Sequence, residues 1–559
     1  MYSNIIDGLD ERQKEAVLSN ASRILVVAPP GSGKTRVLVC RFARFLLDGV
    51  SPDGILAVTF TNRAAAEMRK RVGELASSGT AQPNIGTFHS FCLKFLKKGR
   101  PGFLLYGRAE TAGLLREMGV RNSDKAADMI SSAKNRSTLL EGDDLEVFNL
   151  YQGEMKKRGA LDLDDLILET LNALKAPDAI HGALFSHVMV DAFQDINRPQ
   201  SSLIRLLAGP HRGEAAGPST SLFAIGDPDQ AIYGFRGSDV KCFLDFGRDY
   251  AGAEVIRLLC NYRSMENIVK ASGALIGRGR DGRGTHTKCG SDSAISGKGA
   301  ISVIRVNDER AEAEFIVREI EALMGGLSSL TVTGGQPDAR FSDFAVLYRT
   351  NRQAEALADA FMRSPIPYHV AGPPAPCLKD FIARLRGHAP EAGVELRDLV
   401  KPEAVIMGID DGLLAILLDK AEGLHGPDIG AFLAEMSLLE PSDNLDIKAD
   451  RVNLMTLHAS KGLEFRTVFI AGVEEGLIPL TKSGMEADLE EERRLFYVGI
   501  TRAKERLYIL SAEKRRMRGE IQERRPSPML KDIPGEFFAE KVVEKKKTAR
   551  RPRQKGLFE

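Results

Sequence analysis

The chain has 559 residues, of which 43% are hydrophobic and 27% are charged, and its formal net charge is +1. A chain of this length is expected to form more than one hydrophobic core, and no apolar run is long enough to cross a bilayer. The near-zero net charge supplies no global field that would attract a polyanion, so any nucleic-acid site has to be local.

The N-terminal segment and the cysteines exclude two further classes of protein. MYSNIIDGLDERQ is polar and acidic, whereas a secretory signal is basic and then apolar, so we expect a cytoplasmic protein. The six cysteines occur singly, without the CxxC pairing of a zinc site or a redox dithiol. We expect reduced core residues at Cys40, Cys92, Cys242, Cys260, Cys289 and Cys377.

Short apolar runs typical of buried strands recur along the chain. Many of them precede stretches rich in Ala, Glu, Lys and Arg, which are typical of helices. The expected strands are Ile24–Ala28, Ile55–Phe60, His187–Asp191, Leu222–Asp227, Ala300–Val306, Phe344–Tyr348, Val452–Leu457, Thr467–Ala471 and Leu507–Ser511. This alternation predicts parallel-sheet α/β domains.

Two helical stretches interrupt the alternation. Residues 91–183 show no clear strand and predict an insertion into a first α/β domain made of 1–90 and 184–258. Residues 372–446 predict a shorter insertion into a second domain made of 259–371 and 447–535. The remaining residues, 536–559, are dense in Lys and Arg and are expected to form a flexible basic tail.

A phosphate-binding loop follows the first expected strand. APPGSGKT consists mostly of small residues and precedes a helix-like stretch, so backbone N–H groups and a helix N-terminus would bind phosphate oxygens. Lys34 would reach the β and γ phosphates, and Thr35 would ligate Mg²⁺. The residues predicted to hold the nucleotide here are Ala28, Pro29, Pro30, Gly31, Ser32, Gly33, Lys34 and Thr35.

The metal partner of such a loop is an aspartate at the end of a buried strand. HVMVDAFQD supplies Asp191 directly after an apolar run. Because the strand and the loop occur together, we expect Asp191 and Thr35 to share the Mg²⁺ site.

An ordered series of segments then resembles the motifs of the UvrD/Rep/PcrA superfamily 1 DNA helicases. These segments are LDERQKEAV (9–17), VTFTNRAAAEM (58–68), IGTFHSFC (85–92), IGDPDQAIYGFRG (225–237), NYRS (261–264), VNLMTLHASKGLEF (452–465) and EERRLFYVGITRAKERLYI (491–509). The resemblance implies two RecA-like P-loop NTPase domains, each with a mainly helical insertion, and ATP with Mg²⁺ as cofactors. It implies an ATP-dependent helicase that translocates 3′→5′ on single-stranded DNA, acts at single-strand/duplex junctions, and serves DNA repair or replication restart.

The resemblance also assigns roles to single residues. Arg263 and Arg502 correspond to arginine fingers and Gln230 to the γ-phosphate sensor. Gln13 would bind the adenine edge, Arg36 and Tyr262 would enclose the base, and Glu464 would lie near the ribose. The corresponding DNA contacts are Phe60, Thr61, Asn62, His89, Tyr233, Phe235 and His458. For any aromatic residue taken alone, core packing is the alternative.

The chain departs from this family at Ala192, where the family has the glutamate that deprotonates the attacking water. Losing a general base typically slows a reaction by about 10²–10⁴-fold, so we expect slow hydrolysis with nucleotide binding largely intact. An engineered trap, a degenerate paralogue and rescue by another carboxylate such as Asp195 all remain open. A non-catalytic, ATP-gated DNA-binding protein is therefore the alternative function.

The second insertion and the tail carry two further expectations. GPPAPCLKD (372–380) departs from the GG-rich opening of the family's second insertion, so duplex contact through it is not implied. The tail ends QKGLFE and resembles a sliding-clamp-binding peptide over Gln554–Phe558, with Leu557 and Phe558 filling an apolar pocket. The alternative is a terminus whose basic residues only add non-specific DNA affinity.

Overall fold

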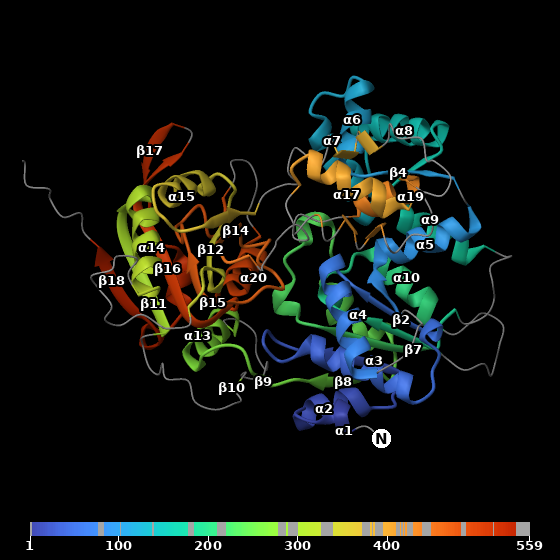
Figure 1. Cartoon of the computed structure of the whole chain (residues 1–559), viewed down its shortest axis with the longest axis horizontal. Coiled ribbons are helices and arrows are strands. Elements are labelled where there is room, and N and C mark those ends of the chain that lie inside the picture. Colours follow the sequence, from blue (N-terminus) through green and yellow to red (C-terminus); the bar gives the residue numbers. More distant parts are fainter. Residues whose placement is uncertain are drawn as a thin grey trace, which may run out of the picture. The chain divides into compact units, whose positions relative to one another are not determined.

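The structure is a computed structural model. It describes residues 3–76, 83–100, 102–136, 139–176, 184–209, 220–277, 287–288, 300–325, 339–371, 449–481, 488–517 and 519–543, with short stretches between 381 and 438. The chain forms two compact units, one of residues 1–263, 282–290 and 371–447 and one of residues 264–281, 291–370 and 448–559. Figure 1 shows the helices and strands of both units.

The first unit is built on a six-stranded parallel sheet in the order β3-β2-β6-β7-β1-β8. Its strands are β1 (Arg23–Val27), β2 (Ile55–Thr59), β3 (Asn84–Thr87), β6 (His187–Val190), β7 (Ser221–Gly226) and β8 (Glu254–Arg257). Separate hydrophobic cores lie on its two faces, because the side chains of each strand alternate between them. One core takes residues from α2 (Glu11–Leu18), α3 (Lys34–Leu47) and α4 (Asn62–Ala76), with α1 (Ser3–Ile6) beside them. The other takes residues from α5 (Phe88–Gly99), α9 (Leu163–Lys175), α10 (Arg198–Ala208), α11 (Lys241–Leu244) and α12 (Phe246–Asp249).

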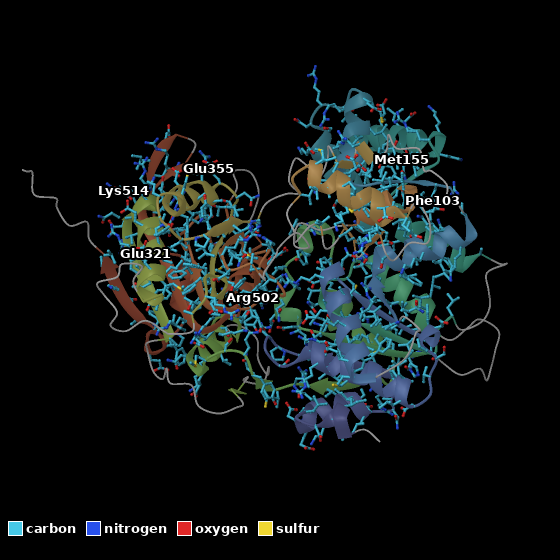
Figure 2. The ribbon with its side chains drawn as sticks, viewed as in Figure 1. Phe103, Met155, Glu321, Glu355, Arg502 and Lys514 are labelled. Carbon is cyan, nitrogen blue, oxygen red and sulfur yellow. The ribbon has the colours of Figure 1, made fainter. Side chains whose placement is uncertain are left out.

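The first predicted insertion is helical but not free of strands. Its helices α6 (Arg108–Glu117), α7 (Ser123–Arg136) and α8 (Gly142–Lys157) enclose their own small core, which contains Tyr151 and Met155. Met155 is labelled in Figure 2. The expectation of no strand was wrong, because β4 (Leu104–Tyr106) and β5 (Ala160–Asp162) form a parallel pair. Strands of three residues are too short to produce a visible sequence period.

The second predicted insertion belongs spatially to the first unit. Its described helices are α17 (Leu396–Ile406), which has Pro402 inside it, and α19 (Ile429–Ser437). We expected this segment to be part of the second α/β domain, but its residues group with the first unit. Ala434 and Leu438 lie in the same core as Phe88 and Leu96 of α5, so burial of these side chains accounts for the placement.

The second unit contains a larger sheet in the order β13-β14-β12-β15-β16-β11-β18, with β17 paired to β16. Its strands are β11 (Ile301–Asp308), β12 (Phe344–Tyr348), β13 (Tyr368–Val370), β14 (Val452–Thr456), β15 (Phe465–Ile470), β16 (Ala503–Met517), β17 (Glu520–Glu523) and β18 (Ala539–Val543). Its helices are α13 (Glu266–Gly277), α14 (Glu309–Leu323), α15 (Gln353–Met362) and α20 (Leu489–Ile500). A short parallel pair, β9 (Cys260–Asn261) and β10 (Thr287–Lys288), belongs to the first unit.

The C-terminal tail begins later than expected. Residues 539–543 form β18, which pairs in parallel with β11 at the edge of the second sheet. The backbone hydrogen bonds of an edge strand do not require an apolar sequence, so the charged segment AEKVV gave no strand signal. The tail from residue 544, including the predicted clamp peptide Gln554–Phe558, lies outside the described residues.

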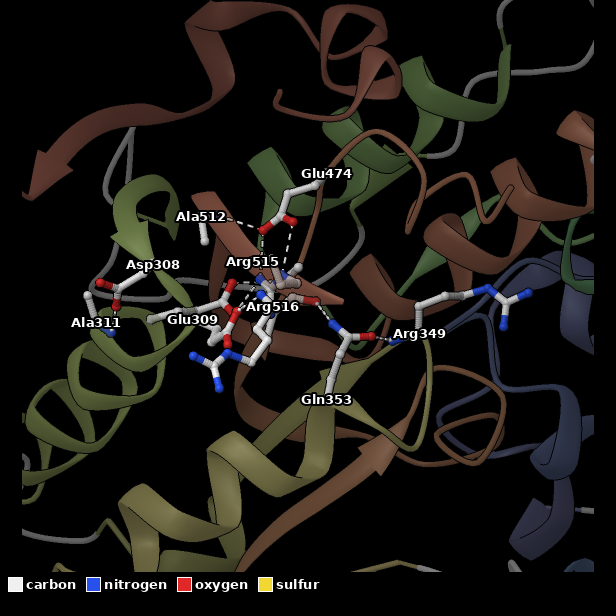
Figure 3. Close-up of polar contacts among 12 residues, drawn as sticks. Asp308, Glu309, Ala311, Arg349, Gln353, Glu474, Ala512, Arg515 and Arg516 are labelled. Carbon is white, nitrogen blue, oxygen red and sulfur yellow. Dashed lines mark hydrogen bonds and ion pairs between the residues drawn. The ribbon is translucent and has the colours of Figure 1, made fainter. Parts of the chain in front are cut away.

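The second unit contains a buried ion cluster, in which Arg515 pairs with two glutamates (Figure 3). The Arg515 guanidinium donates to Glu312 at 2.7 Å and to Glu474 at 2.6 and 3.0 Å. Both carboxylates also accept backbone N–H groups, from Gly472 and Ala512. Burial raises the pKa of Glu312, and the adjacent Arg515 opposes that rise. Removing one member of such a cluster would leave an uncompensated buried charge, which is strongly destabilising.

The remaining expectations on the fold have mixed outcomes. All nine expected strands are present, eight of them within two residues of their predicted limits, whereas β16 begins before and ends well after the expected Leu507–Ser511. None of the helices in the described ranges has the length and apolar character needed to cross a membrane. Cys40 and Cys92 are buried free thiols and Cys242 is a half-buried one, whereas Cys260 is disulfide-bonded, so the expectation of a reduced thiol was wrong there.

His187, at the start of β6, makes the first unit sensitive to acid. Its Nδ1 lies 2.6 Å from Ser221 Oγ, and its ring stacks on Phe45 with centroids 3.8 Å apart. Burial, with Arg41 and Arg44 nearby, lowers the pKa of His187 from 6.5 to about 4. The unfolded chain therefore takes up a proton first as the pH falls, so the free energy of unfolding decreases between these two values.

We predict that His187→Gln reduces the loss of thermal stability of the first unit between pH 7.5 and pH 5, because this proton uptake is removed. Thermal unfolding at both pH values checks it. An equal loss in the variant and the wild type would contradict the assignment of acid sensitivity to His187.

Candidate nucleotide and DNA site

The carboxyl ends of adjacent parallel strands bring the predicted nucleotide residues together. The phosphate-binding loop follows β1, Asp191 follows β6 and Asp227 follows β7, and these three strands are neighbours in the sheet. Ala28 N donates to Gly226 O at 2.8 Å, which continues the β1–β7 pairing into the loop. Ligand sites of open α/β sheets lie at this edge.

The phosphate-binding loop has the backbone conformation that its glycines allow. Gly31 and Gly33 have φ values of +74° and +83°, and Gly33 directly precedes α3, which begins at Lys34. Lys34 Nζ donates to Ala28 O at 2.7 Å and to Pro29 O at 3.0 Å, so its ammonium lies against the loop. The loop and the lysine thus form the cation-lined cradle expected for phosphates.

Gln13 is held by the loop and by its own helix. Its Oε1 accepts Asp10 N at 3.1 Å, while Asp10 Oδ1 accepts Gln13 N at 2.8 Å, so the two residues form the capping box of α2. Its Nε2 donates to Ser32 O at 2.8 Å. These contacts fix which end of the buried side-chain amide is donor and which is acceptor.

The segment after β8 is attached to the same loop. Asn261 Nδ2 donates to Pro30 O at 2.8 Å and Tyr262 N donates to Gly31 O at 2.8 Å. Asn261 Oδ1 also accepts Arg263 N at 2.9 Å, which sets the course of the chain at the predicted arginine finger. We did not predict a role for Asn261, although its place beside Tyr262 and Arg263 was a signal for one.

The two residues predicted to enclose adenine both contact the segment between α1 and α2. Tyr262 is 50% exposed, and its hydroxyl donates to Asp10 Oδ2 at 2.6 Å. Arg36, the third residue of α3, donates to Asp7 O at 3.0 Å. Both residues are therefore hydrogen-bonded just before the helix that carries Gln13.

The oxygen donors around Asp191 suit a hard cation. Asp191 Oδ1 accepts Ala192 N at 2.9 Å, and Thr59 Oγ1 lies 3.5 Å from Oδ2. Thr35 is the second residue of α3. In the part of the chain that the structure describes, no group of three or more His, Cys, Asp or Glu side chains is arranged to hold a metal ion. A carboxylate and a hydroxyl fit Mg²⁺ that takes its other ligands from phosphates and water.

A hydrogen-bond chain links the loop after β6 to the loop after β7. Asp195 Oδ2 accepts Gln194 Nε2 at 2.8 Å, and Gln194 Oε1 accepts Asp227 N at 3.0 Å. Asp227 Oδ2 then accepts Gln230 Nε2 at 2.6 Å. All four side chains are buried, so the two loops share one buried polar network.

Ala192 has an unusual backbone conformation. With φ +52° and ψ +42° it lies in the left-handed region, where it begins the short 3-10 helix η2 (Phe193–Asp195). This conformation costs an L-residue about 1–2 kcal/mol, and such strain is concentrated at functional sites. The methyl side chain still offers neither a proton acceptor nor a hydrogen bond to water.

Three predicted DNA-binding aromatics form a continuous platform after β2 and β7. Phe60 and Tyr233 stack with centroids 4.7 Å apart and planes inclined by 10°, and Tyr233 lies 6.2 Å from Phe235. Phe235, in the 3-10 helix η4 (Gly234–Arg236), is 61% exposed. The Arg236 guanidinium lies 5.5 Å from the Tyr233 ring and 5.8 Å from the Phe235 ring. We did not predict Arg236, although its place in the GFRG segment was a signal.

The other residues of the first unit that were predicted to contact DNA have different local environments. Thr61 Oγ1 accepts Ala64 N at 3.2 Å at the start of α4, and His89 is the half-buried second residue of α5. Asn62 Nδ2 donates to Leu438 O at 2.9 Å, so this side chain is engaged by the second insertion.

Arg502, Glu464 and His458 belong to the second unit. The Arg502 side chain (labelled in Figure 2) is buried and donates to Val498 O and Leu463 O at 2.9 Å each. Glu464 pairs with Lys504 at 2.8 Å, and His458 lies in the turn after β14. Their roles at the nucleotide and on DNA stay predictions.

Gly31 tests the loop geometry. A Cβ there would lie 2.7 Å from both Arg263 Cβ and Asn261 Oδ1, and the positive φ adds strain. We predict that Gly31→Ala strongly weakens nucleotide binding, measured by titration with a fluorescent ATP analogue. Gly49→Ala is the matched control, because Gly49 has φ +86° with no atom within 4 Å of the added Cβ. It should lose about 1–2 kcal/mol of stability but keep its affinity. Equal affinities for the two variants would contradict the assignment.

Comparison with known proteins agrees with this geometry. The family model of the UvrD/REP helicase N-terminal domain matches residues 9–103 and 109–251, and that of the UvrD-like helicase C-terminal domain matches residues 256–374 and 414–514. The ATP-dependent DNA helicase UvrD1 of Mycobacterium leprae is 32% identical, with 96% of this chain and 86% of the relative covered. The ATP-dependent DNA helicase PcrA of Bacillus subtilis is 30% identical, with 98% and 88% covered. The chain therefore belongs to the UvrD/REP family of ATP-dependent DNA helicases, with two RecA-like domains.

Proposed function

We propose that the chain is an ATP-driven motor that moves 3′→5′ on single-stranded DNA and acts at single-strand/duplex junctions in DNA repair or replication restart. The observation that supports the motor function is the buried series of hydrogen bonds Asp195–Gln194–Asp227–Gln230. It joins the loop after β6, which bears Asp191 and is called the metal loop below, to the loop that bears Tyr233 and Phe235. Polarity and pathway rest on the family resemblance, as does a cytoplasmic location.

Adenine selection is supported by the fixed amide of Gln13. One hydrogen of Nε2 is used by Ser32 O and one lone pair of Oε1 by Asp10 N, which leaves one donor and one acceptor. Adenine offers N7 as an acceptor and its N6 amine as a donor, whereas guanine offers two acceptors on that edge. Gln13 is therefore complementary to ATP and mismatched to GTP.

We propose that Thr35 and Asp191 hold Mg²⁺, which would neutralise charge that develops on the phosphates during transfer. Lys34, Arg263 and Arg502 would contribute further positive charge, and Gln230 would orient the γ-phosphate. The donor types support this assignment. The DNA strand would stack on Phe60, Tyr233 and Phe235, since aromatic stacking tolerates any base sequence.

The proposed domains follow the predicted boundaries with one change. We assign 1–90 and 184–258 to the first RecA-like domain, 91–183 to its insertion, and 372–446 to a second insertion. The second RecA-like domain takes 259–371 and 447–543, because the β11–β18 pairing supports a later end.

Ala192 is the reason for the alternative function, in which the protein is non-catalytic and its DNA binding is controlled by ATP. Asp195 is a poor replacement for the missing base, because its carboxylate is buried and accepts Gln194 Nε2. That contact favours a role in positioning Gln194. We therefore propose that hydrolysis is slow in this chain and that nucleotide binding is retained.

Restoring the carboxylate tests this proposal. Ala192→Glu adds no new backbone strain, because alanine already carries a Cβ at this left-handed position. We predict a gain of about 10²–10⁴-fold in DNA-stimulated ATP hydrolysis, measured by phosphate release with and without single-stranded DNA. Lys34→Ala combined with Ala192→Glu is the control, because it removes the cation that would face the phosphates and should abolish the gain. An unchanged rate in Ala192→Glu would contradict a single missing base.

We also propose that Gln554–Phe558 docks on a sliding clamp, as its sequence suggests. Deleting Gln554 to Glu559 should abolish clamp binding in a pull-down with purified clamp and leave single-strand affinity unchanged as salt is varied, because the basic residues before Gln554 remain. The idea fails if the intact chain shows no clamp binding, or if the deletion lowers DNA affinity alone.

A further inference from the structure

Asn197 lies where the ends of two loops meet. It follows η2 by two residues and begins α10, where its Oδ1 accepts Gln200 N at 2.8 Å. Its backbone forms an isolated antiparallel bridge with Ser238, and Asp239 N donates to Ile196 O at 3.0 Å. The end of the metal loop is thus hydrogen-bonded to the end of the loop that carries the DNA platform.

The side chain of Asn197 also reaches the first insertion. Its Nδ2 donates to Asn135 Oδ1 at 2.6 Å, and both residues are buried. Asn135 belongs to α7, which packs beside both α10 and η4, the turn that holds Phe235. One amide pair therefore lies between the nucleotide loops and the helix beside the DNA platform.

The far side of Asn135 is hydrogen-bonded to the start of α9. Asn135 Nδ2 donates to Asp164 Oδ1 at 2.8 Å, at the start of α9. The adjacent Lys134 ammonium, also buried, pairs with Asp162 at 2.6 Å and with Asp165 at 2.7 Å. Because α7 and α9 share these buried polar contacts, a displacement of Asn135 would move both helices together and would not be absorbed by its side chain.

We propose that the Asn135–Asn197 amide pair is a positioning link that couples the nucleotide-dependent state of the two loops to the first insertion and the DNA platform beside it. The inference rests on the proposed function. When the loop after β6 shifts on binding nucleotide, α7 must follow or the pair must break. Breaking it would deprive the buried Asn197 Nδ2 and the buried Asn135 Oδ1 of each other as partners, which is unfavourable.

Two variants separate the link from the local fold. Asn197→Asp keeps an oxygen that caps α10, since Asp and Asn are equally good N-caps, but it removes the donor to Asn135. Asn135→Ala breaks the link from the other side and does not touch α10. Asn172→Ala is the matched control, because Asn172 lies on α9 of the same insertion and donates to Glu169 at 3.3 Å on the exposed surface.

The experiment measures the Kd of the full-length chain for a labelled oligo-dT with and without saturating AMP-PNP and Mg²⁺, and the Kd for AMP-PNP alone. In the wild type and in Asn172→Ala, nucleotide should change the oligo-dT Kd by a factor of about 5–150. In Asn197→Asp and Asn135→Ala this factor should fall about tenfold or to unity, since roughly one buried hydrogen bond is lost. The separate affinities for each ligand should stay close to those of the wild type.

Every other result contradicts either the amide link alone or the link together with the proposed function. A normal factor in both variants, with coupling in the wild type, overturns the link alone. Weaker binding of each ligand with the factor preserved shows a purely structural role and also overturns the link. No coupling in the wild type overturns the ATP-driven function together with the link that rests on it.

Discussion

The hydrogen-bonded carbonyl oxygens of the phosphate-binding loop are the constraint on which the rest of the nucleotide site depends. The oxygens of Ala28 and Pro29 accept Lys34 Nζ, that of Pro30 accepts Asn261 Nδ2, that of Gly31 accepts Tyr262 N, and that of Ser32 accepts Gln13 Nε2. Because these carbonyl oxygens are held by hydrogen bonds, the backbone conformation of the loop is fixed before an anion binds to it. The loop thereby fixes the segments that would bind adenine and the γ-phosphate.

The strands and this loop could be predicted because their signals are local. An apolar run followed by small residues needs no knowledge of distant segments, and the ordered motifs identified the family. The short pair β4–β5 and the charged edge strand β18 were missed because their hydrogen bonds come from partners remote in sequence. The packing of Ala434 and Leu438 into the first unit was missed for the same reason. Nothing in the local sequence of Asn135 indicates that its side chain meets Asn197.

The substitution at Ala192 is expected to affect ATP hydrolysis and not nucleotide binding, although both depend on the same loop. Asp191, the proposed metal ligand, and the buried hydrogen bonds that begin at Gln194 are both present in this loop. The backbone at Ala192, between them, is left-handed. What is missing is a carboxylate on a backbone already shaped to present one. We propose that a loop of this kind still binds nucleotide and still links it to the DNA platform, whereas the chemical step lacks its base. This combination suits a motor whose nucleotide state persists for long periods on DNA.

The central claim is that the nucleotide site binds ATP normally but cleaves it slowly, and a single-turnover experiment on the unaltered chain tests it most directly. The protein, in excess over radiolabelled ATP, is mixed with Mg²⁺ and oligo-dT, and bound ATP and ADP are followed over time. We predict stoichiometric binding with ATP persisting in the complex, and cleavage slower by about 10²–10⁴-fold than in a site with its general base. Rapid DNA-stimulated conversion of the bound ATP to ADP would contradict the account.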